Sequence, residues 1–420
     1  MERLPGFRDF YPEPVPARDA WSASVRQHLF AQWRHVAERY GFREYDGPPL
    51  EPLELFTVKS GAEIVGQLYN FTDKGGRDVS LRPEMTPTLA RMAAAAERQY
   101  KKPLKWFAIP QLFRYERQQK GRLREHFQFN ADILGEADPA ADAELIALLI
   151  DSLRALGLTG EDFVVRLSSR TAWQEFFDRG AADRSRAYEF FQVVDKLERE
   201  APETSAQRLD ELGFTLAQVR EFIERAEPTA DLQAILSSLS ARNLAAYVKL
   251  DYTVIRGLAY YTGTVFEAFD RKGEFRAIAG GGRYDNLLKL ISGGKVDLPA
   301  LGFGMGDVVL TELLRARGRL PAREGALDVF VLVADEAQRT ASLGFVQQLR
   351  EAGSRVEYPM TPAKWDRQFK RALELGATWT AQLLAAANGG AAVRLKALAT
   401  REEFELPLAD ALGRIVSRAG

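Results

Sequence analysis

The segment FRYERQQKGRLREHFQFNADILG, residues 113–135, contains the most informative pattern in the chain. It completes one strand-like run, LKWFAIPQLFRYE, and contains the next, HFQFNADILG, with the charged loop RQQKGRLRE between them. Two strand-like runs joined by a polar loop that contains glycine predict an antiparallel hairpin. Because side chains alternate between the faces of a strand, Arg114 and Glu116 share one face, and so do Gln128 and Asp132.

The charged face of this hairpin has two interpretations. One face of an antiparallel sheet commonly meets water, and its charges then need no further role. The alternative is a phosphate site, because arginine can bind phosphate through paired hydrogen bonds and the loop adds Arg117, Lys120 and Arg124. A face packed in a core would not accept these charges unpaired. This segment alone leaves both interpretations open.

Three shorter motifs contain further candidates for ligand contacts. In LRPEMT (81–86), Glu84 and Thr86 lie two residues apart at a predicted strand-to-helix junction, where they can receive an ammonium group. Thr86 could equally be only a helix N-cap. The motifs RGLAYYTG (256–263) and GGGRYD (280–285) have glycines that allow a ligand close to the backbone. Neither matches a dinucleotide or P-loop fingerprint, so each is weak by itself.

The composition excludes several classes of site. The 420 residues include no cysteine and three histidines, which excludes disulfides, cysteine-ligated zinc and a histidine-rich metal site. The net charge of -1 shows no basic excess, so RNA could be bound only through local patches. No apolar run reaches the roughly 18 residues of a membrane span, and the N-terminus lacks the apolar core of a signal peptide. We therefore expect a cytoplasmic protein without a membrane segment.

The chain is long enough for two or three domains. Apolar residues at three- and four-residue steps predict one helix over 15–41 that ends at its glycine. A charge-laced helical stretch at about 170–245 is typical of an insertion between two halves of a sheet. After a polar linker at 314–328, strands and helices alternate, which predicts an α/β unit with a largely parallel sheet. The expected domains are 1–322 and 323–420.

Taken together and in this order, the motifs resemble those of histidyl-tRNA synthetases, a family of class II aminoacyl-tRNA synthetases. The resemblance extends from GFRDFYP (6–12) to the C-terminus. Pro48 matches the proline that ends the class II dimer motif, and residues 113–135 match the second class II motif without a gap. GFGMGD (302–307) occupies the place of the third, while RGLAYYTG and GGRYD are similar to two histidine-specific motifs.

The resemblance implies a fold, a reaction and partners. The fold is an α+β class II catalytic domain, an antiparallel sheet flanked by helices with a helical insertion, followed by an α/β anticodon-binding domain. The carboxylate of L-histidine attacks the α-phosphorus of ATP, which gives histidyl-adenylate and pyrophosphate, and the terminal adenosine of tRNA(His) then takes the acyl group. The resemblance further implies Mg²⁺ bound with ATP, no metal held by the protein alone, and a homodimer.

The resemblance also implies a role for each matching residue. Arg256 and Arg114 would be catalytic and hold the α-phosphate, Arg114 with the substrate carboxylate as well. The residues implied in ATP binding are Arg114, Glu116 (at the adenine amino group), Arg122 and His126. The residues implied in histidine binding are Glu84, Thr86 and Gln128 for the α-ammonium group, Asp132 and Tyr261 for the imidazole, and Tyr284 in the pocket wall. Arg117 and Gln119 would contact the tRNA acceptor end.

Three positions depart from the family pattern. His126 stands where a phenylalanine usually stacks on adenine, so an altered stacking platform is expected. Val309 occupies the position of the arginine that normally contacts the γ-phosphate in the third class II motif. Ala259 replaces the usual aspartate of RGLDYY. The valine leaves the holder of the γ-phosphate unassigned.

Two other classes of protein have related sequences. The regulatory subunit of ATP phosphoribosyltransferase is a non-catalytic paralogue that binds histidine, but it generally lacks the C-terminal α/β domain. About 90 residues follow the linker here, and the loop keeps RQQKGR, both of which favour the synthetase. A regulatory or scaffold protein with a degenerate module need not keep Arg114, Arg256 and Glu84 together, and this chain has all three.

Overall fold

The structure is a computed structural model, and the chain in it divides into two compact units, Met1–Leu320 and Pro321–Gly420. The described residues are 2–13, 15–17, 20–60, 62–115, 123–197, 200–255, 261–321, 327–385 and 391–416. The division falls two residues before the boundary expected from the sequence. Among the helices of these ranges, none has the length and apolar character that crossing a membrane requires.

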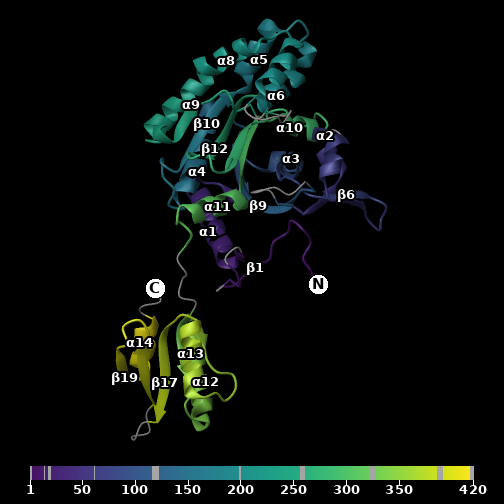
Figure 1. Ribbon diagram of the computed structural model, residues 1–420. Coiled ribbons are helices and arrows are strands. Elements are labelled where there is room, and N and C mark those ends of the chain that lie inside the picture. The colour runs from purple at the N-terminus through teal and green to yellow at the C-terminus, as the bar shows by residue number, and fades with distance from the viewer. Residues whose placement is uncertain are drawn as a thin grey trace. The chain divides into compact units, whose positions relative to one another are not determined.

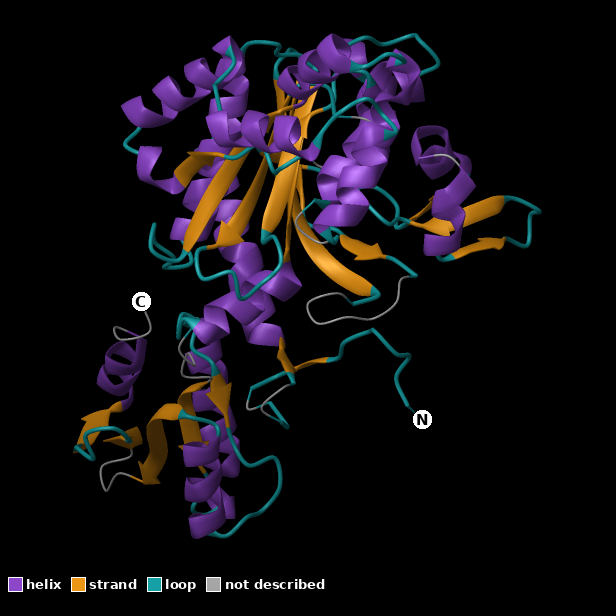
Figure 2. Ribbon diagram, turned by 45° about the horizontal axis from the view of Figure 1, so that its top comes forward, coloured by secondary structure: helices purple, strands orange, loops and turns teal. Residues whose placement is uncertain are grey.

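The first unit is built on a large sheet with helices on both faces (Figures 1 and 2). Its strands, in spatial order, are β11 (Val248–Leu250), β10 (Phe163–Ser169), β12 (Thr264–Asp270), β13 (Ala279–Arg283), β14 (Ala300–Gly306), β9 (Glu125–Leu134), β7 (Leu104–Ala108) and β3 (Arg43–Glu44), with β8 (Gln111–Phe113) also paired to β9. Neighbours from β10 to β7 are antiparallel, whereas β11 and β3 add parallel strands at the edges. The predicted class II sheet and its central hairpin are thus confirmed.

The alternation of side chains along β9 gives this sheet one apolar and one polar face. Phe129, Ala131 and Ile133 lie in the main hydrophobic core. The helices that supply buried residues to that core include α1 (Ala23–Arg39), α4 (Pro139–Arg154) and α11 (Asp307–Ala316). Gln128 and Asp132 alternate with these apolar residues and therefore lie on the opposite face. A smaller apolar cluster with α3 (Thr86–Ala95) and α10 (Leu287–Ile291) packs at one end of that face.

The helix predicted over 15–41 is shorter than expected, because α1 begins only at Ala23. Ser22 caps it by accepting a hydrogen bond from the Val25 N–H at 3.2 Å. The residues before the cap pair instead as short parallel strands, β1 (Phe10–Tyr11) and β2 (Trp21–Ser22). The predicted end is confirmed, since Gly41 follows the helix at a φ of 76°.

The helical insertion lies between β10 and β11 and forms the upper layer of the first unit in Figure 1. Its helices are α5 (Arg170–Gly180), α6 (Ala187–Lys196), α7 (Pro202–Asp210), α8 (Leu216–Arg225) and α9 (Ala230–Ala241). An aromatic cluster holds them together, with Trp173 and Phe176 each 4.6 Å from Phe222 between ring centroids. The Trp173 indole N–H donates to the Tyr252 carbonyl at 3.1 Å, which ties the insertion to the segment after β11.

A small antiparallel sheet and one helix lead into α3. The strands β4 (Leu50–Pro52), β6 (Asp78–Leu81) and β5 (Asn70–Thr72) lie in that order, with α2 (Glu54–Ser60) between β4 and β5 along the chain. After β6, the buried Arg82 donates to the Gly47 carbonyl at 2.7 Å and to the Gln111 carbonyl at 3.1 Å. These bonds fix the start of the LRPEMT segment against β8.

The second unit is a five-stranded α/β sheet. Its strands, in spatial order, are β16 (Val356–Glu357), β15 (Leu327–Leu332), β17 (Ala377–Ala385), β18 (Ala391–Ala397) and β19 (Glu403–Pro407). The expectation of a largely parallel sheet was wrong, because only β16–β15 and β15–β17 are parallel. The last three strands follow one another closely, and short connections join antiparallel neighbours. Two helices, α12 (Arg339–Glu351) and α14 (Leu408–Val416), cover one face, and α13 (Trp365–Glu374) packs on the other.

Candidate active site

The polar face of the first unit's sheet has a floor of glycines. In β14, Gly302, Gly304 and Gly306 alternate with core residues and lie opposite the polar positions of β9. A Cβ atom at Gly304 would lie 2.6 Å from Cδ of Gln128, and one at Gly302 would collide with the Asp132 carboxylate. The glycines of GFGMGD therefore make room for the side chains of Gln128 and Asp132 to lie across β14.

A cavity of about 240 Å³ opens beside this floor. Its lining residues are Arg114, Leu123, His126, Gln128, Glu267, Arg276, Ala277, Ile278, Ala279, Gly280, Gly304, Gly306, Val308 and Val309. Three of the predicted site residues, Arg114, His126 and Gln128, thus meet in one cavity. They do so because β8 and β9 form the predicted hairpin and present these side chains on the same face.

Among the described residues that line this cavity, His126 is the one with a flat ring, and it lies on β9. The neighbouring Phe127 points to the other face, where its ring lies 5.2 Å from that of Phe30 and the Arg26 guanidinium lies 5.3 Å from it. Phe127 therefore cannot replace the stacking phenylalanine that the family usually has. The predicted altered platform is an imidazole, which lies above Gly306.

Arg114 is positioned by the LRPEMT segment. Its Nε–H donates to the Pro83 carbonyl at 3.0 Å, which places Arg114 directly beside the residue before Glu84. Glu84 is half-buried. Thr86 is not the N-cap of α3, since Met85 occupies that position and Thr86 is the first helical residue. The structure thus brings the two motifs of the sequence, LRPEMT and FRYE, together at Arg114.

A second group of predicted site residues lies farther along β9, around Asp132. The Tyr284 hydroxyl donates to Oδ1 of Asp132, and the two side chains are buried. Tyr261 belongs to the same apolar cluster as Tyr284. Burial raises the pKa of Asp132 to about 7, and the hydrogen bond from Tyr284 opposes that rise. Tyr284, predicted only to line the pocket, is therefore a direct hydrogen-bond partner of Asp132.

Tyr45 is a further residue of this region that the sequence analysis missed. Its hydroxyl is buried and has no hydrogen-bond partner in the described part of the chain. Burial and then the charge of Asp132 raise the pKa of this hydroxyl, so the two groups act on each other. Tyr45 lies two residues after Arg43, at the edge strand β3, and only the strand order brings that edge near Asp132.

The GGRYD motif has residues with structural contacts on both sides of Tyr284. Arg283 donates to Oδ2 of Asp142 at 2.6 Å and to the Asp138 carbonyl at 3.0 Å, which fixes the start of α4. Asp285 accepts hydrogen bonds from the Thr262 hydroxyl at 2.9 Å and from the Ala300 N–H at 3.0 Å. Between these two anchors, Tyr284 is held with its hydroxyl toward Asp132.

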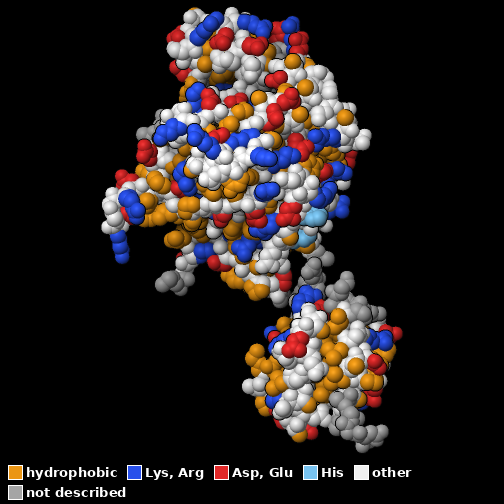
Figure 3. Space-filling model, turned by 180° about the vertical axis from the view of Figure 1, so that it is seen from behind, with side chains coloured by type: hydrophobic (Ala, Val, Ile, Leu, Met, Phe, Trp, Pro, Cys, Tyr) orange, Lys and Arg blue, Asp and Glu red, His pale blue; other side chains and the backbone are white. Residues whose placement is uncertain are grey.

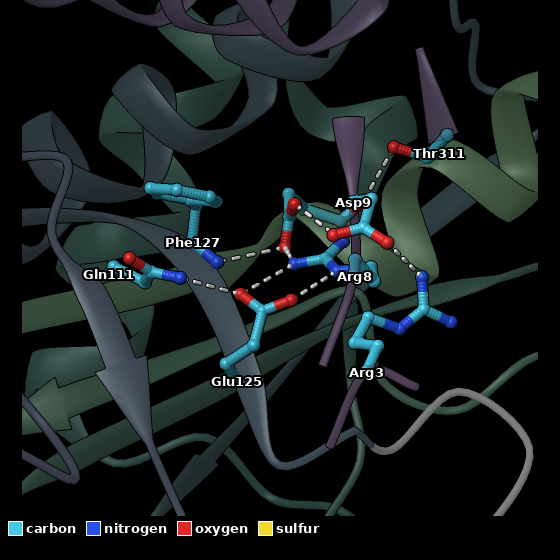
Figure 4. Close-up of polar contacts among 8 residues, drawn as sticks. Arg3, Arg8, Asp9, Gln111, Glu125, Phe127 and Thr311 are labelled. Carbon is cyan, nitrogen blue, oxygen red and sulfur yellow. Dashed lines mark hydrogen bonds and ion pairs between the residues drawn. The ribbon is translucent and has the colours of Figure 1, made fainter. Parts of the chain in front are cut away.

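Arg8, from the N-terminal segment, connects β9 with α11, two elements that contribute residues to the cavity lining (Figure 4). Arg8 donates to Oε1 of Glu125 at 2.6 Å and to Oδ2 of Asp307 at 2.8 Å, and all three side chains are at least 98% buried. Asp307 also accepts from the Phe127 N–H at 3.0 Å. These contacts join the start of β9, which contains His126, to the start of α11, which contains Val309.

Some predicted residues lie outside the described part of the chain. These are Glu116, Arg117, Gln119, Arg122 and Arg256. Among the described residues, no group of three or more histidine and carboxylate side chains is placed to hold a metal ion. Glu267 is the one carboxylate among the described residues that line the cavity.

Comparison with known proteins identifies the family. A sequence profile of histidyl-tRNA synthetase matches residues 15–307. A histidine–tRNA ligase of Opitutus terrae is 44% identical to this chain, with 97% of the chain and 96% of the relative aligned. The chain belongs to the histidyl-tRNA synthetase family. Another family member, from Thermoplasma volcanium, is 38% identical over 89% of this chain and 88% of its own length.

Solved structures have the same fold. The histidyl-tRNA synthetase of a Nostoc species superposes with a TM-score of 0.76 at 23% identity, covering 97% of this chain and 98% of its own. A Bacillus halodurans structure described as an ATP phosphoribosyltransferase regulatory subunit/histidyl-tRNA synthetase gives a TM-score of 0.72 at 22% identity, covering 88% and 96%. The fold is therefore that of solved histidyl-tRNA synthetases, and the sequence relatives favour the synthetase family over the regulatory subunit.

Proposed function

We propose that this chain attaches L-histidine to tRNA(His) in the cytoplasm, where protein synthesis takes place, through a histidyl-adenylate made from ATP. The observation that carries the proposal is the juxtaposition of two sites on one sheet face. Asp132, the carboxylate of a buried carboxylate–tyrosine pair suited to an imidazole, lies on β9. The same strand contributes His126 to the cavity that Arg114 also lines. The family membership of the chain supports the same reaction.

Selection of histidine is assigned to Asp132 and the tyrosines around it. An ionised Asp132 accepts one imidazole N–H, and the hydroxyl of Tyr261 serves the other ring nitrogen. An amino acid without these ring nitrogens would leave the buried carboxylate with its bond from Tyr284 but without the imidazole donor, which is the strong form of selectivity. Glu84, Thr86 and Gln128 are assigned to the α-ammonium group, because Gln128 lies between Asp132 and His126 along β9.

Adenylate formation then depends on alignment. A carboxylate oxygen of histidine attacks the α-phosphorus, the bond to the β-phosphate oxygen breaks, and pyrophosphate leaves. Arg114, held by Pro83, stabilises the charge that develops on the α-phosphate. Arg256 is proposed to contact the same phosphate, and Glu116, Arg122 and His126 to bind the rest of ATP. In the second step the terminal adenosine of the tRNA takes the acyl group, with Arg117 and Gln119 proposed to contact the acceptor end.

The one carboxylate of the described cavity lining fits a metal that arrives with the nucleotide. Mg²⁺ commonly keeps several waters and is bound through one or two carboxylates plus substrate phosphates. Glu267 faces the cavity and can serve as such a carboxylate. When bound, Mg²⁺ neutralises phosphate charge, and Glu267 would hold it against the β12 wall.

The direct test is ATP–pyrophosphate exchange with each of the twenty amino acids. We expect exchange with histidine alone, because only its side chain satisfies Asp132. A charging assay with tRNA(His) should then give histidyl-tRNA. Exchange without any amino acid dependence, or with a different amino acid, would refute the proposal.

The second unit is proposed to bind the anticodon region of the tRNA. Helix α13 covers only part of its sheet face, and a groove of about 560 Å³ remains beside it. Trp365 lines this groove with 43% of its surface exposed, together with Phe369, Lys370, Arg394 and Lys396. Single-stranded RNA binds to such surfaces by stacking bases on aromatic rings beside positive charges. On the face in Figure 3, acidic and basic side chains lie interspersed over the first unit, so local patches rather than a general positive field must bind RNA.

Trp365→Ala should therefore separate the two steps of the reaction. Loss of one stacking contact costs about 1–3 kcal/mol, so the KM for tRNA should rise by about fivefold to 150-fold. Histidine-dependent pyrophosphate exchange should stay unchanged, because the first unit contains the adenylation residues. Leu343→Ala, an exposed apolar residue on α12 and outside the groove, is the matched control. An unchanged KM for tRNA in the Trp365 variant would remove the groove from the proposal.

We also propose a homodimer, as the resemblance implies, but the apolar residues of α1 do not support it. Leu29, Trp33 and Val36 of that helix are buried within a single chain, so they offer nothing to a second copy. The segment that matches the class II dimer motif contains Pro48 and is exposed, and it follows the edge strand β3. Sedimentation at micromolar concentration distinguishes a dimer from a monomer of 47.0 kDa.

A further inference from the structure

The cavity beside the glycine floor has an arginine on two opposite sides. Arg114 follows β8 and belongs to the hairpin with β9, whereas Arg276 precedes β13. Strand β14, with Gly304 and Gly306, lies between β13 and β9 in the sheet. A ligand lying on these glycines therefore has Arg114 on one side and Arg276 on the other. These two are the arginines among the described residues of the lining.

The wall from α11 is apolar where the family pattern has an arginine. Val308 and Val309 of the first turn line the cavity, and the only charged residue of that turn, Asp307, is buried against Arg8. Helix α11 thus contributes no positive charge to the cavity. A triphosphate that enters the cavity must find its second positive charge elsewhere.

Arg276 and this apolar turn border the same cavity. Ala279 of β13 pairs with Met305 of β14, and the strands are antiparallel. Arg276 lies just before the start of β13 and Val308 just after the end of β14, so both lie at the same end of this antiparallel pair. Arginine has a long, flexible side chain, so its guanidinium can reach the space above Val309. The segment before β13 thus brings to the cavity a positive charge that α11 lacks.

We propose that Arg276 binds the outer phosphates of ATP and takes over the contact that an arginine at position 309 would make. This inference rests on the proposed function, since it assumes that the cavity takes ATP. Arginine binds phosphate oxygens through paired, charge-assisted hydrogen bonds, which suits the β- and γ-phosphates. Glu267 adds one negative charge to the same wall, and a cation must lie between it and the phosphates. Arg276 or the metal that accompanies ATP fills that role.

The test compares nucleotides with and without outer phosphates. In the Arg276→Gln variant, the dissociation constant for ATP should rise about tenfold to a hundredfold, whereas that for AMP should stay within about twofold. The KM for ATP in histidine-dependent exchange should rise by the same factor, with the KM for histidine unchanged. Lys272→Gln removes a positive charge from the same exposed loop without touching the cavity lining, and it should bind ATP normally.

Moving the arginine from position 276 to position 309 gives a more specific test. The double variant Arg276→Gln/Val309→Arg should recover most of the lost ATP affinity, because it returns the arginine to α11. Thermal melting of each variant shows whether it folds, and AMP binding shows whether the adenosine site is intact. Normal ATP affinity in folded Arg276→Gln, or equal losses for ATP and AMP, would overturn the inference. Because these readouts are binding constants, they remain decisive even if the wild-type chain shows no histidine-dependent exchange.

Discussion

Asp132→Asn should abolish histidine-dependent pyrophosphate exchange, lowering kcat/KM for histidine by about a thousandfold or more. The amide that replaces one carboxylate oxygen presents a donor to the imidazole N–H, so a buried polar group of the pocket is left unpaired. A site built to hydrogen-bond its substrate rejects a mismatched partner by about 10⁴–10⁵-fold, so a thousandfold is a conservative expectation. Steady-state exchange at saturating ATP measures the effect.

The same substitution should make the folded protein more stable at high pH. Burial raises the pKa of Asp132 to about 7, far above the value near 3.9 of an unfolded chain. Between these two values the folded state keeps a proton that the unfolded state has lost, so stability falls as the pH rises from about 4 to 7. The full loss is on the order of 4 kcal/mol. Asparagine avoids it, although its buried amide costs about 1–3 kcal/mol in return.

Thermal melts of the first unit's transition between pH 4 and 8.5 check this sign. The free energy of unfolding of the variant should rise relative to that of the wild type as the pH rises. At pH 4 the variant should be no more stable than the wild type. Asp210→Asn, at an exposed position of α7, makes the same chemical change on the surface and should follow the wild type at every pH. If the Asp132 variant lost stability at pH 8.5, an unrecognised positive partner of the carboxylate would have to be present.

The sequence predicted those parts of the site that depend on a single strand or hairpin. Period-2 alternation alone put Gln128 and Asp132 on one face of β9, and the structure has both over the glycine floor. The resemblance named Tyr284, but not its bond to Asp132. That bond depends on the order β13–β14–β9, which places two strands far apart in the sequence on either side of a glycine strand.

The features that the sequence did not predict depend on contacts between segments that are distant in the chain. Tyr45 reaches the region of Asp132 only through the edge strand β3, and nothing in its local sequence indicates a polar role. Helix α1 was predicted too long because apolar periodicity continued through Trp21, whereas Ser22 offered a cap and Trp21 a strand partner in Phe10. In the second unit, alternating strands and helices predicted a largely parallel sheet. The last three strands instead pair as antiparallel neighbours without a helix between them. Local patterns do not encode these choices.

The second large effect is expected at Arg8, where Arg8→Met should destabilise the first unit by about 3–5 kcal/mol at neutral pH. Arg8 lies between Glu125 and Asp307, and all three side chains are at most 2% exposed (Figure 4). Removing one partner from a buried ion network leaves the others charged and unpaired, which is the costly case. Arg3→Met is the matched control, because its pair with Asp9 is about half exposed and should contribute under about 1 kcal/mol.

The pH dependence of this variant distinguishes charge from packing. Burial raises the pKa of Asp307 even with Arg8 beside it, and the loss of Arg8 should raise it further. The folded variant then keeps protons that the unfolded chain has released, so its deficit should shrink as the pH falls toward 5. Adding Glu125→Gln and Asp307→Asn to Arg8→Met should recover much of the stability at neutral pH. A deficit that is the same at pH 5 and pH 8, and is not recovered by the neutral triple variant, would assign the effect to lost packing instead.

Arg8 should also act on the nucleotide cavity through Asp307, as a positioning residue. Oδ1 of Asp307 accepts the Phe127 N–H at 3.0 Å, so the carboxylate holds the strand that presents His126 while its own helix presents Val309. If Arg8→Met is assayed where it remains folded, the KM for ATP should rise more than the KM for histidine, because Asp132 lies five residues farther along β9 from Phe127. A purely structural role would lower the active fraction and leave both KM values unchanged. The split between the two KM values therefore decides whether the N-terminal arginine only stabilises the fold or also shapes the ATP site.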